Sequence, residues 1–118
     1  MIFDQWDVVT IPFPFMDMPV SKNRPALVMS TRMFNDENGH TVFAMITTAK
    51  ASTWPSDYLL AEPEAAGLTK NCFVRWKTFT LPNDIIVRRL GKLAQQDERH
   101  VEGQMKDIFI TKVMISNT

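Results

Sequence analysis

The sequence WDVVTIPFPFMDMPVSKNRPALVMS, residues 6–30, contains two candidate β-strands separated by a polar segment. Residues 7–15 are rich in β-branched and aromatic side chains, which favours a strand, and their two prolines predict a sheet edge or a bulge. Residues 26–30 are almost continuously apolar, which is typical of a strand buried on both faces. Residues 16–24 are polar and are predicted to form a loop, and the proline that follows Arg24 restricts this residue to extended geometry at the loop-to-strand junction.

The rest of the chain continues the strand-rich pattern. Further strands are predicted at residues 40–48, 58–61, 72–80 and 85–93, with turns at 35–39 and 81–84. Apolar and polar residues alternate along the strand at 72–80, so Phe73, Arg75 and Lys77 are expected on one face of the sheet. Gly91 interrupts the last strand and predicts a bulge there.

One helix is predicted near the end of the sequence. Apolar residues recur at helical spacing from Val101 through Met105 to Ile108. Two acids, Asp97 and Glu98, precede them in the first turn, where negative charge favours the helix dipole. Several short strands followed by one helix predict a mostly β fold, in which a bent antiparallel sheet or small barrel is closed by a C-terminal α-helix.

Composition predicts one domain, residues 1–118, with enough apolar side chains (45%) for a core. Net charge is zero, which argues against a protein that coats nucleic acid through bulk electrostatics. The single cysteine, Cys72, excludes an internal disulfide framework and a cysteine-based zinc site, and it fits a reducing compartment. The sequence shows neither a secretory signal nor an apolar run of roughly 18–20 residues, so we expect a cytoplasmic protein with no membrane contact.

Common catalytic signatures are absent from the sequence. It contains no P-loop, no dinucleotide-binding glycine pattern, no HExxH and no GxSxG. His40 and His100 are far apart and have no metal-ligand spacing. We therefore expect neither a metal site nor a cofactor.

Cations and hydroxyls at predicted strand ends remain as candidates for chemistry. Arg24 begins one strand, Thr47 and Thr48 end another, and Arg75 and Lys77 lie on a third. If they gather in space, such groups suit a phosphate ligand, because guanidinium binds phosphate bidentately and hydroxyls add hydrogen bonds. Each also has an ordinary structural explanation, and the excess of cations in residues 65–92 equally fits a solvated surface with scattered ion pairs. The residues alone leave both alternatives open.

The order of the segments resembles the MazF/PemK toxin family. Residues 6–30 are similar to the family's opening, a hydrophobic strand and a flexible loop followed by Arg-Pro and a second hydrophobic strand. The family's later segments resemble FAMITT (43–48), AAGLTKNCFVRWKTFTLP (65–82) and RRLGKLAQQD (88–97). The likeness spans almost the whole chain in the expected order.

The resemblance implies an SH3-like barrel of the MazF/PemK/CcdB type with a C-terminal helix, usually as a homodimer. It implies a toxin of a type II toxin–antitoxin system that cleaves single-stranded RNA, commonly messenger RNA, at short sequences and is inhibited by a cognate antitoxin. Arg24 matches the arginine of the Arg-Pro motif and Thr47 matches the threonine that ends the third strand, the family's main catalytic pair. Arg75 falls where some PemK-like members have a second catalytic arginine.

The sequence departs from the family pattern at several positions. Trp6 stands where the family usually has glycine, and Lys77 stands where a PemK member carries aspartate. Cys72 replaces a common serine and is expected to be a packed core thiol. The loop at 16–23 also lacks the glycine-rich character often seen.

For the cleavage we expect the substrate's own 2′-hydroxyl to attack the adjacent phosphorus, giving a 2′,3′-cyclic phosphate and a 5′-hydroxyl without a metal. Arg24 would stabilise the developing charge, Thr47 would hold the phosphate or the attacking hydroxyl, and Arg75 would add a second positive contact. Unpaired bases stack on exposed aromatic side chains, for which Trp54 is the best candidate. The residues expected to contact RNA are Lys22, Asn23, Thr48, Trp54 and Lys77.

The sequence is also compatible with two other functions. The gyrase-poisoning toxin CcdB shares the barrel, so the fold alone does not fix the activity, although its aromatic residue near the chain end has no counterpart here. A degenerate member that has lost catalysis and acts as an RNA-binding or regulatory protein is the second alternative.

Overall fold

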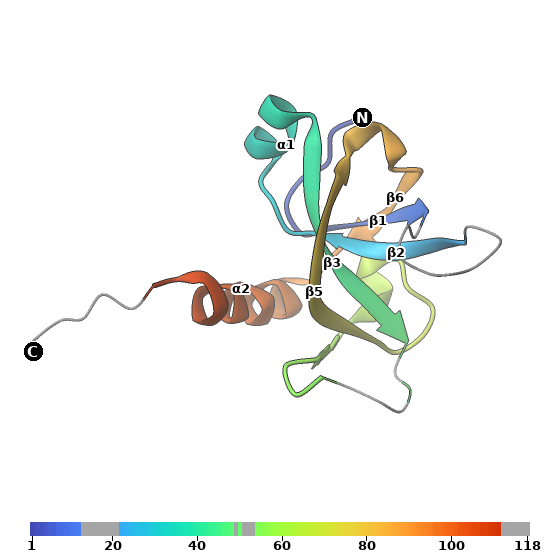
Figure 1. Cartoon of the computed structure of the whole chain (residues 1–118). Helices are drawn as coiled ribbons and strands as arrows, with labels where there is room; N and C mark the ends of the chain where they lie inside the picture. The colour runs from blue at the N-terminus through green and yellow to red at the C-terminus, as the bar shows by residue number, and fades with distance from the viewer. Residues whose placement is uncertain (13–21, 49, 51–53, 112–118) are drawn as a thin grey trace, which may run out of the picture.

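Six antiparallel strands form one sheet in the order β4–β5–β3–β2–β1–β6, and a helix follows the last strand (Figure 1). The computed structural model describes residues 1–12, 22–48, 50 and 54–111. The strands are β1 (Asp7–Pro12), β2 (Asn23–Val28), β3 (His40–Thr48), β4 (Tyr58–Leu59), β5 (Cys72–Pro82) and β6 (Arg88–Lys92). The helical elements are α1 (Arg32–Asn38), α2 (Gln95–Phe109) and the short 3-10 turns η1 (Pro63–Ala66) and η2 (Asn83–Ile85).

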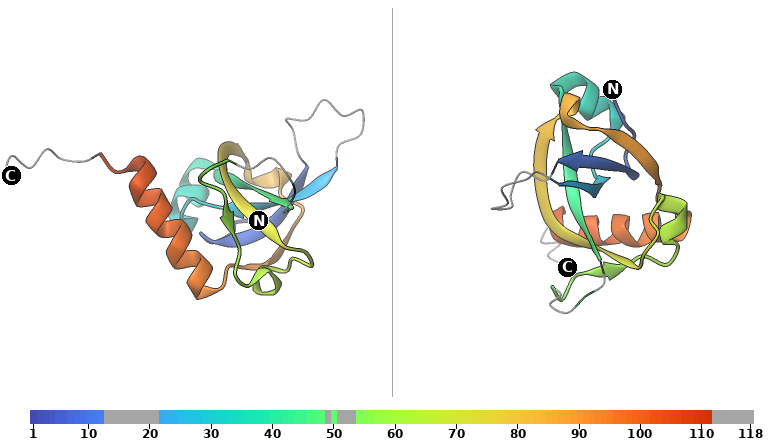
Figure 2. Two further views of the ribbon diagram at one scale, coloured as in Figure 1. Left: turned by 90° about the horizontal axis from the view of Figure 1, so that it is seen from below. Right: turned by 90° about the vertical axis from the view of Figure 1, so that its right-hand side faces the viewer.

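The sheet is strongly curled. The right-hand view of Figure 2 shows the strands bending into an incomplete barrel, with α2 lying along one end. This arrangement confirms the predicted mostly β fold with a C-terminal helix. Among the described residues, no helix is both long and apolar enough to cross a membrane.

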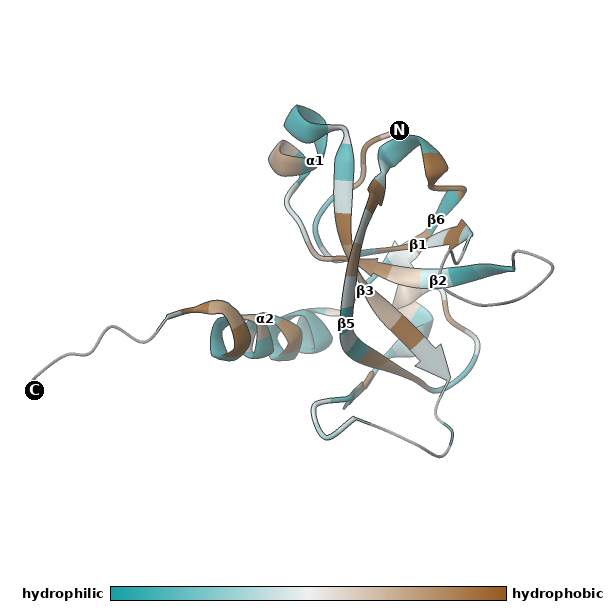
Figure 3. Ribbon diagram, viewed as in Figure 1, coloured by the Kyte–Doolittle hydropathy of each residue, from teal (hydrophilic) through white to brown (hydrophobic). Residues whose placement is uncertain are grey.

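Apolar residues pack on both faces of the sheet, and Figure 3 shows them along the strands and on α2. The α2-side core contains residues of alternate strand positions, such as Val8, Leu27 and Val74, together with Val101 of α2. The far-side core occupies the opposite face and is formed by Phe3, Val9, Ile11, Ala26, Val28 and Phe43. Neighbouring residues of β2 thus enter opposite cores, which explains its nearly continuous apolar sequence and confirms that it is buried on both faces.

β5 pairs with β3 along the full length of β3 and contains a bulge. The register steps from Met45–Arg75 to Ala44–Thr78, so Trp76 and Lys77 are two additional residues on β5. Because side chains alternate with period two, an insertion of two residues leaves the faces in phase. Phe73 and Arg75 both precede the bulge and pair with Thr47 and Met45, so they share one face as predicted, whereas Lys77 lies within the bulge itself.

Gly91 lies beside a second bulge, as predicted. The β1–β6 register steps from Val8–Gly91 to Val9–Arg89, which leaves one additional residue on β6. A Cβ at Gly91 would lie only 2.6 Å from the backbone carbon of Ala66. Any side chain at this position would therefore push η1 away from β6, since real Cβ contacts are never so short.

Trp6 adopts a left-handed backbone conformation, with φ of 75°. It is the only non-glycine residue with positive φ among those described, and it occupies the position where the MazF/PemK family usually has glycine. Its N–H donates to the carbonyl of Val28 (2.8 Å), its carbonyl accepts from Leu93 (3.1 Å), and its side chain is 5% exposed in the α2-side core. Trp6 thus adopts a backbone conformation that glycine favours, and it adds a large side chain to the core.

We expect replacement of Trp6 to separate backbone strain from core packing. Trp6→Ala should lower the free energy of unfolding by about 3–5 kcal/mol, because a large buried side chain is lost. Trp6→Gly should be about 1 kcal/mol more stable than Trp6→Ala, because glycine adopts positive φ without a steric penalty. Urea unfolding of the two variants measures the difference. If the glycine variant is no more stable than the alanine variant, the backbone at residue 6 is not strained.

Residues 35–39 were predicted to form a turn, but they belong to α1 and its C-cap. The hydroxyl of Thr31 accepts a hydrogen bond from the N–H of Phe34 (3.3 Å) and so caps the start of the helix. Gly39, with φ of 64°, ends it in the left-handed conformation. The prediction was wrong because the Asn-Asp-Glu-Asn-Gly composition is typical of turns, while the helix depends on its caps and on contacts made by Asn35.

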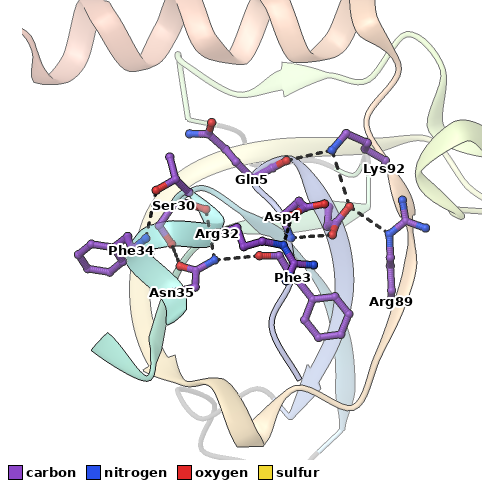
Figure 4. Close-up of polar contacts among 11 residues, drawn as sticks. Phe3, Asp4, Gln5, Ser30, Arg32, Phe34, Asn35, Arg89 and Lys92 are labelled. Carbon is purple, nitrogen blue, oxygen red and sulfur yellow. Dashed lines mark hydrogen bonds and ion pairs between the residues drawn. The ribbon is translucent and has the colours of Figure 1, made fainter. Parts of the chain in front are cut away.

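Asn35 is fully buried and ties α1 to the N-terminal segment (Figure 4). Its Nδ2 donates to the carbonyl oxygen of Phe3 (3.1 Å), and its Oδ1 accepts from the hydroxyl of Ser30. Arg32 adds an exposed ion pair with Asp4 (2.6 Å). A buried amide is tolerated here because its hydrogen-bonding groups are satisfied.

Several element boundaries differ from those predicted. β5 continues to Pro82 through the expected break at 81–84, and β6 begins at Arg88 rather than at residue 85. β2 begins at Asn23, so the last two residues of the predicted loop at 16–24 belong to the strand. The predicted strand residues 13–15 and most of the predicted loop at 16–24 lie outside the described residues.

Candidate functional site

Arg24 and Thr47 lie near the ends of β2 and β3, on the same face of the sheet. Arg24 pairs with Ile11 of β1, a residue of the far-side core. Thr47 lies four residues after Phe43, which belongs to the same core. Because alternate strand residues share a face, both side chains continue the far-side face beyond its buried part.

The two strands separate where these residues lie. β2 and β3 pair from Val28–Phe43 to Ala26–Met45, and Figure 1 shows the start of β2 and the end of β3 diverging beyond that point. Arg24 comes two residues before Ala26, and Thr47 comes two residues after Met45. The register therefore directs one guanidinium and one hydroxyl toward the same open end of the β2–β3 pair.

Arg24 is half-buried, and its side chain has neither an ion-pair nor a hydrogen-bond partner among the described residues. Arg32 and Arg89 are each paired with a carboxylate, in Arg32–Asp4 and Arg89–Asp7, whereas Arg88 and Arg99, like Arg24, have no described carboxylate partner. A guanidinium can bind an anionic ligand, and phosphate matches its planar fork.

Arg75, the second predicted arginine, is bound to an aspartate that the sequence analysis did not identify. Its Nη2 lies 2.8 Å and its Nε 3.1 Å from the two carboxylate oxygens of Asp57, whose side chain is only 2% exposed. The hydrogen bond with Asp57 raises the pKa of Arg75, and hydrogen bonds from Arg75 and from the N–H of Trp54 lower the pKa of Asp57. The pair is therefore ionised on both sides, and its charges largely cancel.

Trp54 lies beside this ion pair. The guanidinium carbon of Arg75 is 5.7 Å from the centre of the Trp54 ring, within the range of a cation–π contact. The backbone N–H of Trp54 donates a hydrogen bond to the carboxylate of Asp57 (3.0 Å). Trp54 is 43% exposed, which confirms the expectation that this aromatic side chain reaches solvent.

The remaining residues expected to contact RNA are exposed. Lys22 and Asn23 lie at the start of β2 beside Arg24, and Thr48 follows Thr47 at the end of β3. Lys77 lies in the β5 bulge, level with Ala44 and Met45 and hence nearer the middle of β3. The structure thus groups the predicted residues around the ends of β2 and β3, with Lys77 farther from Thr47.

The segment around β4 is fastened to α2 at two points. Asp97 of α2 is fully buried and accepts hydrogen bonds from the hydroxyl of Tyr58 and the N–H groups of Ala61 (2.8 Å) and Glu62 (3.0 Å). Burial and the hydrogen bond to Asp97 raise the pKa of Tyr58, which remains a neutral donor. From the sequence, Asp97 was expected only to interact favourably with the helix dipole.

Gln104 of α2 forms the second attachment. Its Nε2 donates to the carbonyl of Ser56 (2.8 Å), and its Oε1 accepts from the indole N–H of Trp76 (2.9 Å). Asp57, which lies between the two attachments, is thereby held in place from both sides.

Other candidate chemistry has a structural explanation. Cys72 is buried in the α2-side core, and burial raises the pKa of its thiol, as expected for a packed residue. Over the described parts of the chain, no three His, Cys, Asp or Glu side chains gather as metal ligands do.

The Asp57–Arg75 pair predicts a pH dependence of stability. The pKa of Asp57 in the folded protein lies below its ordinary value of 3.8, so the stabilisation is complete above that pH and is lost as the pH falls through the folded pKa. The difference in unfolding free energy between wild type and Asp57→Asn should therefore be full at pH 7 and shrink below about pH 4. Urea unfolding at several pH values measures it, with Asp36→Asn as an exposed control, and a constant difference down to pH 3 would contradict the assignment.

Known proteins share both the sequence pattern and the fold. Residues 4–109 match the family described as PemK-like, MazF-like toxin of type II toxin–antitoxin system. No curated protein sequence matches the chain. The matching family region includes every described residue of the site.

Solved structures give the same result for the fold. A MazE–MazF complex from Deinococcus radiodurans superposes with a TM-score of 0.71 at 18% identity, over 92% of this chain and 96% of the other. The Mycobacterium tuberculosis toxin MazF-mt6 superposes with a TM-score of 0.70 at 18% sequence identity, over 91% of this chain and 99% of the other. An endoribonuclease in complex with its cognate antitoxin from a mycobacterial species superposes with a TM-score of 0.68 at 14% sequence identity, over 93% of this chain and 98% of the other.

The curled sheet with its terminal helix is thus the fold of MazF structures, and the family match covers nearly the whole sequence. The chain belongs to the PemK-like, MazF-like toxin family of type II toxin–antitoxin systems.

Proposed function

We propose that this toxin is an endoribonuclease that cleaves single-stranded RNA and is inhibited by a cognate antitoxin in the cytoplasm. One observation carries the proposal: Arg24, which no described carboxylate neutralises, and Thr47 lie on one face at the diverging ends of β2 and β3. The family membership supports it, as does the similar fold of an endoribonuclease solved with its cognate antitoxin.

In the proposed reaction the 2′-hydroxyl of the substrate attacks the adjacent phosphorus. The new bond joins the 2′-oxygen to phosphorus, and the bond from phosphorus to the 5′-oxygen breaks. The 2′-oxygen loses its proton and the departing 5′-oxygen gains one, which leaves a 2′,3′-cyclic phosphate and a 5′-hydroxyl with no net change in protons. Arg24 binds the non-bridging oxygens as negative charge develops, since a guanidinium is too basic to accept a proton at neutral pH. Thr47 donates a hydrogen bond that holds the phosphate in line with the attacking oxygen.

His40 has no part in this proposed reaction. It begins β3, whereas Thr47 lies near the other end of the strand. The seven intervening steps of extended chain span roughly 23 Å, too far for proton transfer.

End-group analysis of the RNA products tests the proposal. Purified protein is incubated with single-stranded RNA in excess EDTA, and the ends of the fragments are identified. The proposal predicts internal cleavage with 2′,3′-cyclic phosphate and 5′-hydroxyl ends. Fragments with 5′-phosphate ends, or intact RNA, would contradict it. Inhibition of gyrase supercoiling by protein that leaves RNA intact would instead indicate a CcdB-like activity, and RNA binding without cleavage would indicate a degenerate member.

We also propose that the toxin acts as a homodimer through the apolar surface of α2. Phe109 is 61% exposed, and Ile108 and Ile110 beside it are also exposed. Met105 and Phe109 line an apolar groove of about 220 Å³ between α2 and the sheet. A second copy of the chain would bury this surface away from water. Large exposed apolar patches on small proteins commonly mark such interaction sites.

The molar mass in solution tests the dimer. Light scattering after size exclusion should give twice the chain mass of 13.6 kDa, and Phe109→Ser should shift the equilibrium toward the monomer. Lys106→Ser, a change on the same helix at a residue paired with Glu102, should leave the dimer intact. A wild-type protein that remains monomeric at micromolar concentration would contradict the proposal.

A further inference from the structure

We propose that Asp57 is a positioning residue that fixes Arg75 and Trp54 as a stacking site for one unpaired nucleobase of the substrate. The proposal rests on the proposed RNA cleavage and gives Arg75 a role in binding the substrate rather than in stabilising the phosphate.

The geometry of Arg75 favours a role in binding a nucleobase over a role in stabilising the negative charge of the phosphate. Two of its nitrogens already donate to Asp57, and its side chain is only 16% exposed. Because a carboxylate lies directly against the guanidinium, a phosphate nearby would feel the field of an almost neutral pair. Arg24, by contrast, has no described partner and can give its full charge to a phosphate.

Trp54 supplies the surface on which a base can stack. Its ring lies against the guanidinium of Arg75, while nearly half of the residue remains exposed to solvent. Single-stranded nucleic acids bind through such aromatic platforms, because every base has a π-face that stacks regardless of sequence. An arginine beside the ring adds a cation–π contribution to the same platform.

Asp57 joins the two parts of the platform. Its carboxylate accepts from Arg75 on β5 and from the backbone N–H of Trp54, so a single buried group sets the positions of both. The register supports this arrangement. Tyr58 pairs with Val74. Asp57, which directly precedes β4, and Arg75 of β5 therefore lie opposite each other, on the other face of the sheet from Tyr58 and Val74. That face also carries Thr47, whose partner on β5 is Phe73.

The attachments to α2 keep the platform rigid. Gln104 holds the carbonyl of Ser56, and Asp97 holds Tyr58 and the backbone that follows β4. A preorganised platform loses little entropy when a base binds, so it improves the affinity for substrate without taking part in the chemical step.

Binding of RNA that resists cleavage tests the proposal independently of catalysis. The probes are single-stranded hexamers of 2′-O-methyl A, U, C and G, which lack the attacking hydroxyl. Trp54 is exposed, whereas Trp6 and Trp76 are buried, so stacking should quench the tryptophan fluorescence accessible to solvent. We expect at least one hexamer to bind with quenching, and Trp54→Ala to weaken its binding about tenfold or more and to abolish the quenching.

Asp57→Asn tests the positioning role on cleavable RNA. We expect KM to rise about tenfold, with kcat changed less than about threefold, because the variant loosens the platform but leaves Arg24 and Thr47 in place. Combining Asp57→Asn with Trp54→Ala should add little to either change alone, since both remove the same platform. Asp36→Asn, which removes an exposed acid of α1, should alter neither constant.

Other outcomes would overturn the proposal. A fall in kcat at constant KM in Asp57→Asn would assign the ion pair to the chemical step. Unchanged hexamer binding by Trp54→Ala would remove the stacking site while leaving the proposed nuclease intact. Loss of antitoxin binding by Trp54→Ala without loss of RNA binding would assign the surface to the antitoxin. A wild-type protein that cleaves no RNA and binds no hexamer would overturn the proposed function as well.

Discussion

Replacement of Arg24 by alanine is expected to reduce kcat/KM for RNA cleavage by at least about 10²–10³-fold, the loss typical when one preorganised donor to a developing oxyanion is removed. The guanidinium of Arg75 cannot take over this role, because it is already bound to Asp57. Arg24 is only half-buried at the end of β2, so the fold should survive the substitution. Initial rates on a single-stranded RNA, together with the thermal unfolding temperature, measure both effects.

Two further variants make this prediction specific. Arg24→Lys keeps the charge but loses the planar fork that binds two phosphate oxygens, so its activity should fall between those of the wild type and Arg24→Ala. Arg99→Ala removes the same charge from an exposed position on α2 and should cleave nearly normally. Normal turnover by a well-folded Arg24→Ala protein would rule out the proposed site.

Replacement of Asp97 by alanine is expected to lower the free energy of unfolding by about 3–5 kcal/mol, as when one partner of a buried polar network is removed. The substitution leaves the Tyr58 hydroxyl and the N–H groups of Ala61 and Glu62 without their acceptor in a buried place. Urea unfolding measures the loss. Hexamer binding by the folded variant should also weaken, because α2 no longer holds the segment that carries Asp57.

Glu98 provides the matched control for Asp97. It occupies the next position in the first turn of α2 and has the same favourable relation to the helix dipole. Its carboxylate makes none of the buried hydrogen bonds of Asp97, so Glu98→Ala should cost less than about 1 kcal/mol. Equal losses in the two variants would show that the helix dipole, rather than the attachment to β4, accounts for the effect of Asp97.

The sequence predicted those parts of the fold that depend on local patterns. Strands such as 40–48 and 72–80 show their periodicity directly, and the spacing of Val101 and Met105 predicts α2. Arg24 and Thr47 could be placed at strand ends for the same reason. Helix α1 was missed because its residues resemble a turn, and only the burial of Asn35 against the N-terminal segment reveals its role.

The interactions that the sequence could not predict are long-range. Asp57 acquires its role only when β4 pairs with β5 and brings it to Arg75, eighteen positions farther along the chain. The attachment of Asp97 to Tyr58 likewise depends on how α2 packs against the sheet. Trp6 is a different case, because its positive φ cannot be inferred from its own side chain. The glycine usual at that position in the family was the one available signal.

A crystal structure of the toxin with a 2′-O-methyl RNA most directly tests whether Arg24 and Thr47 act on one phosphate. We expect a single phosphate within about 3 Å of both the guanidinium of Arg24 and the hydroxyl of Thr47, with a neighbouring base stacked on Trp54. RNA bound elsewhere on the sheet, or a phosphate that contacts only one of the two residues, would contradict it.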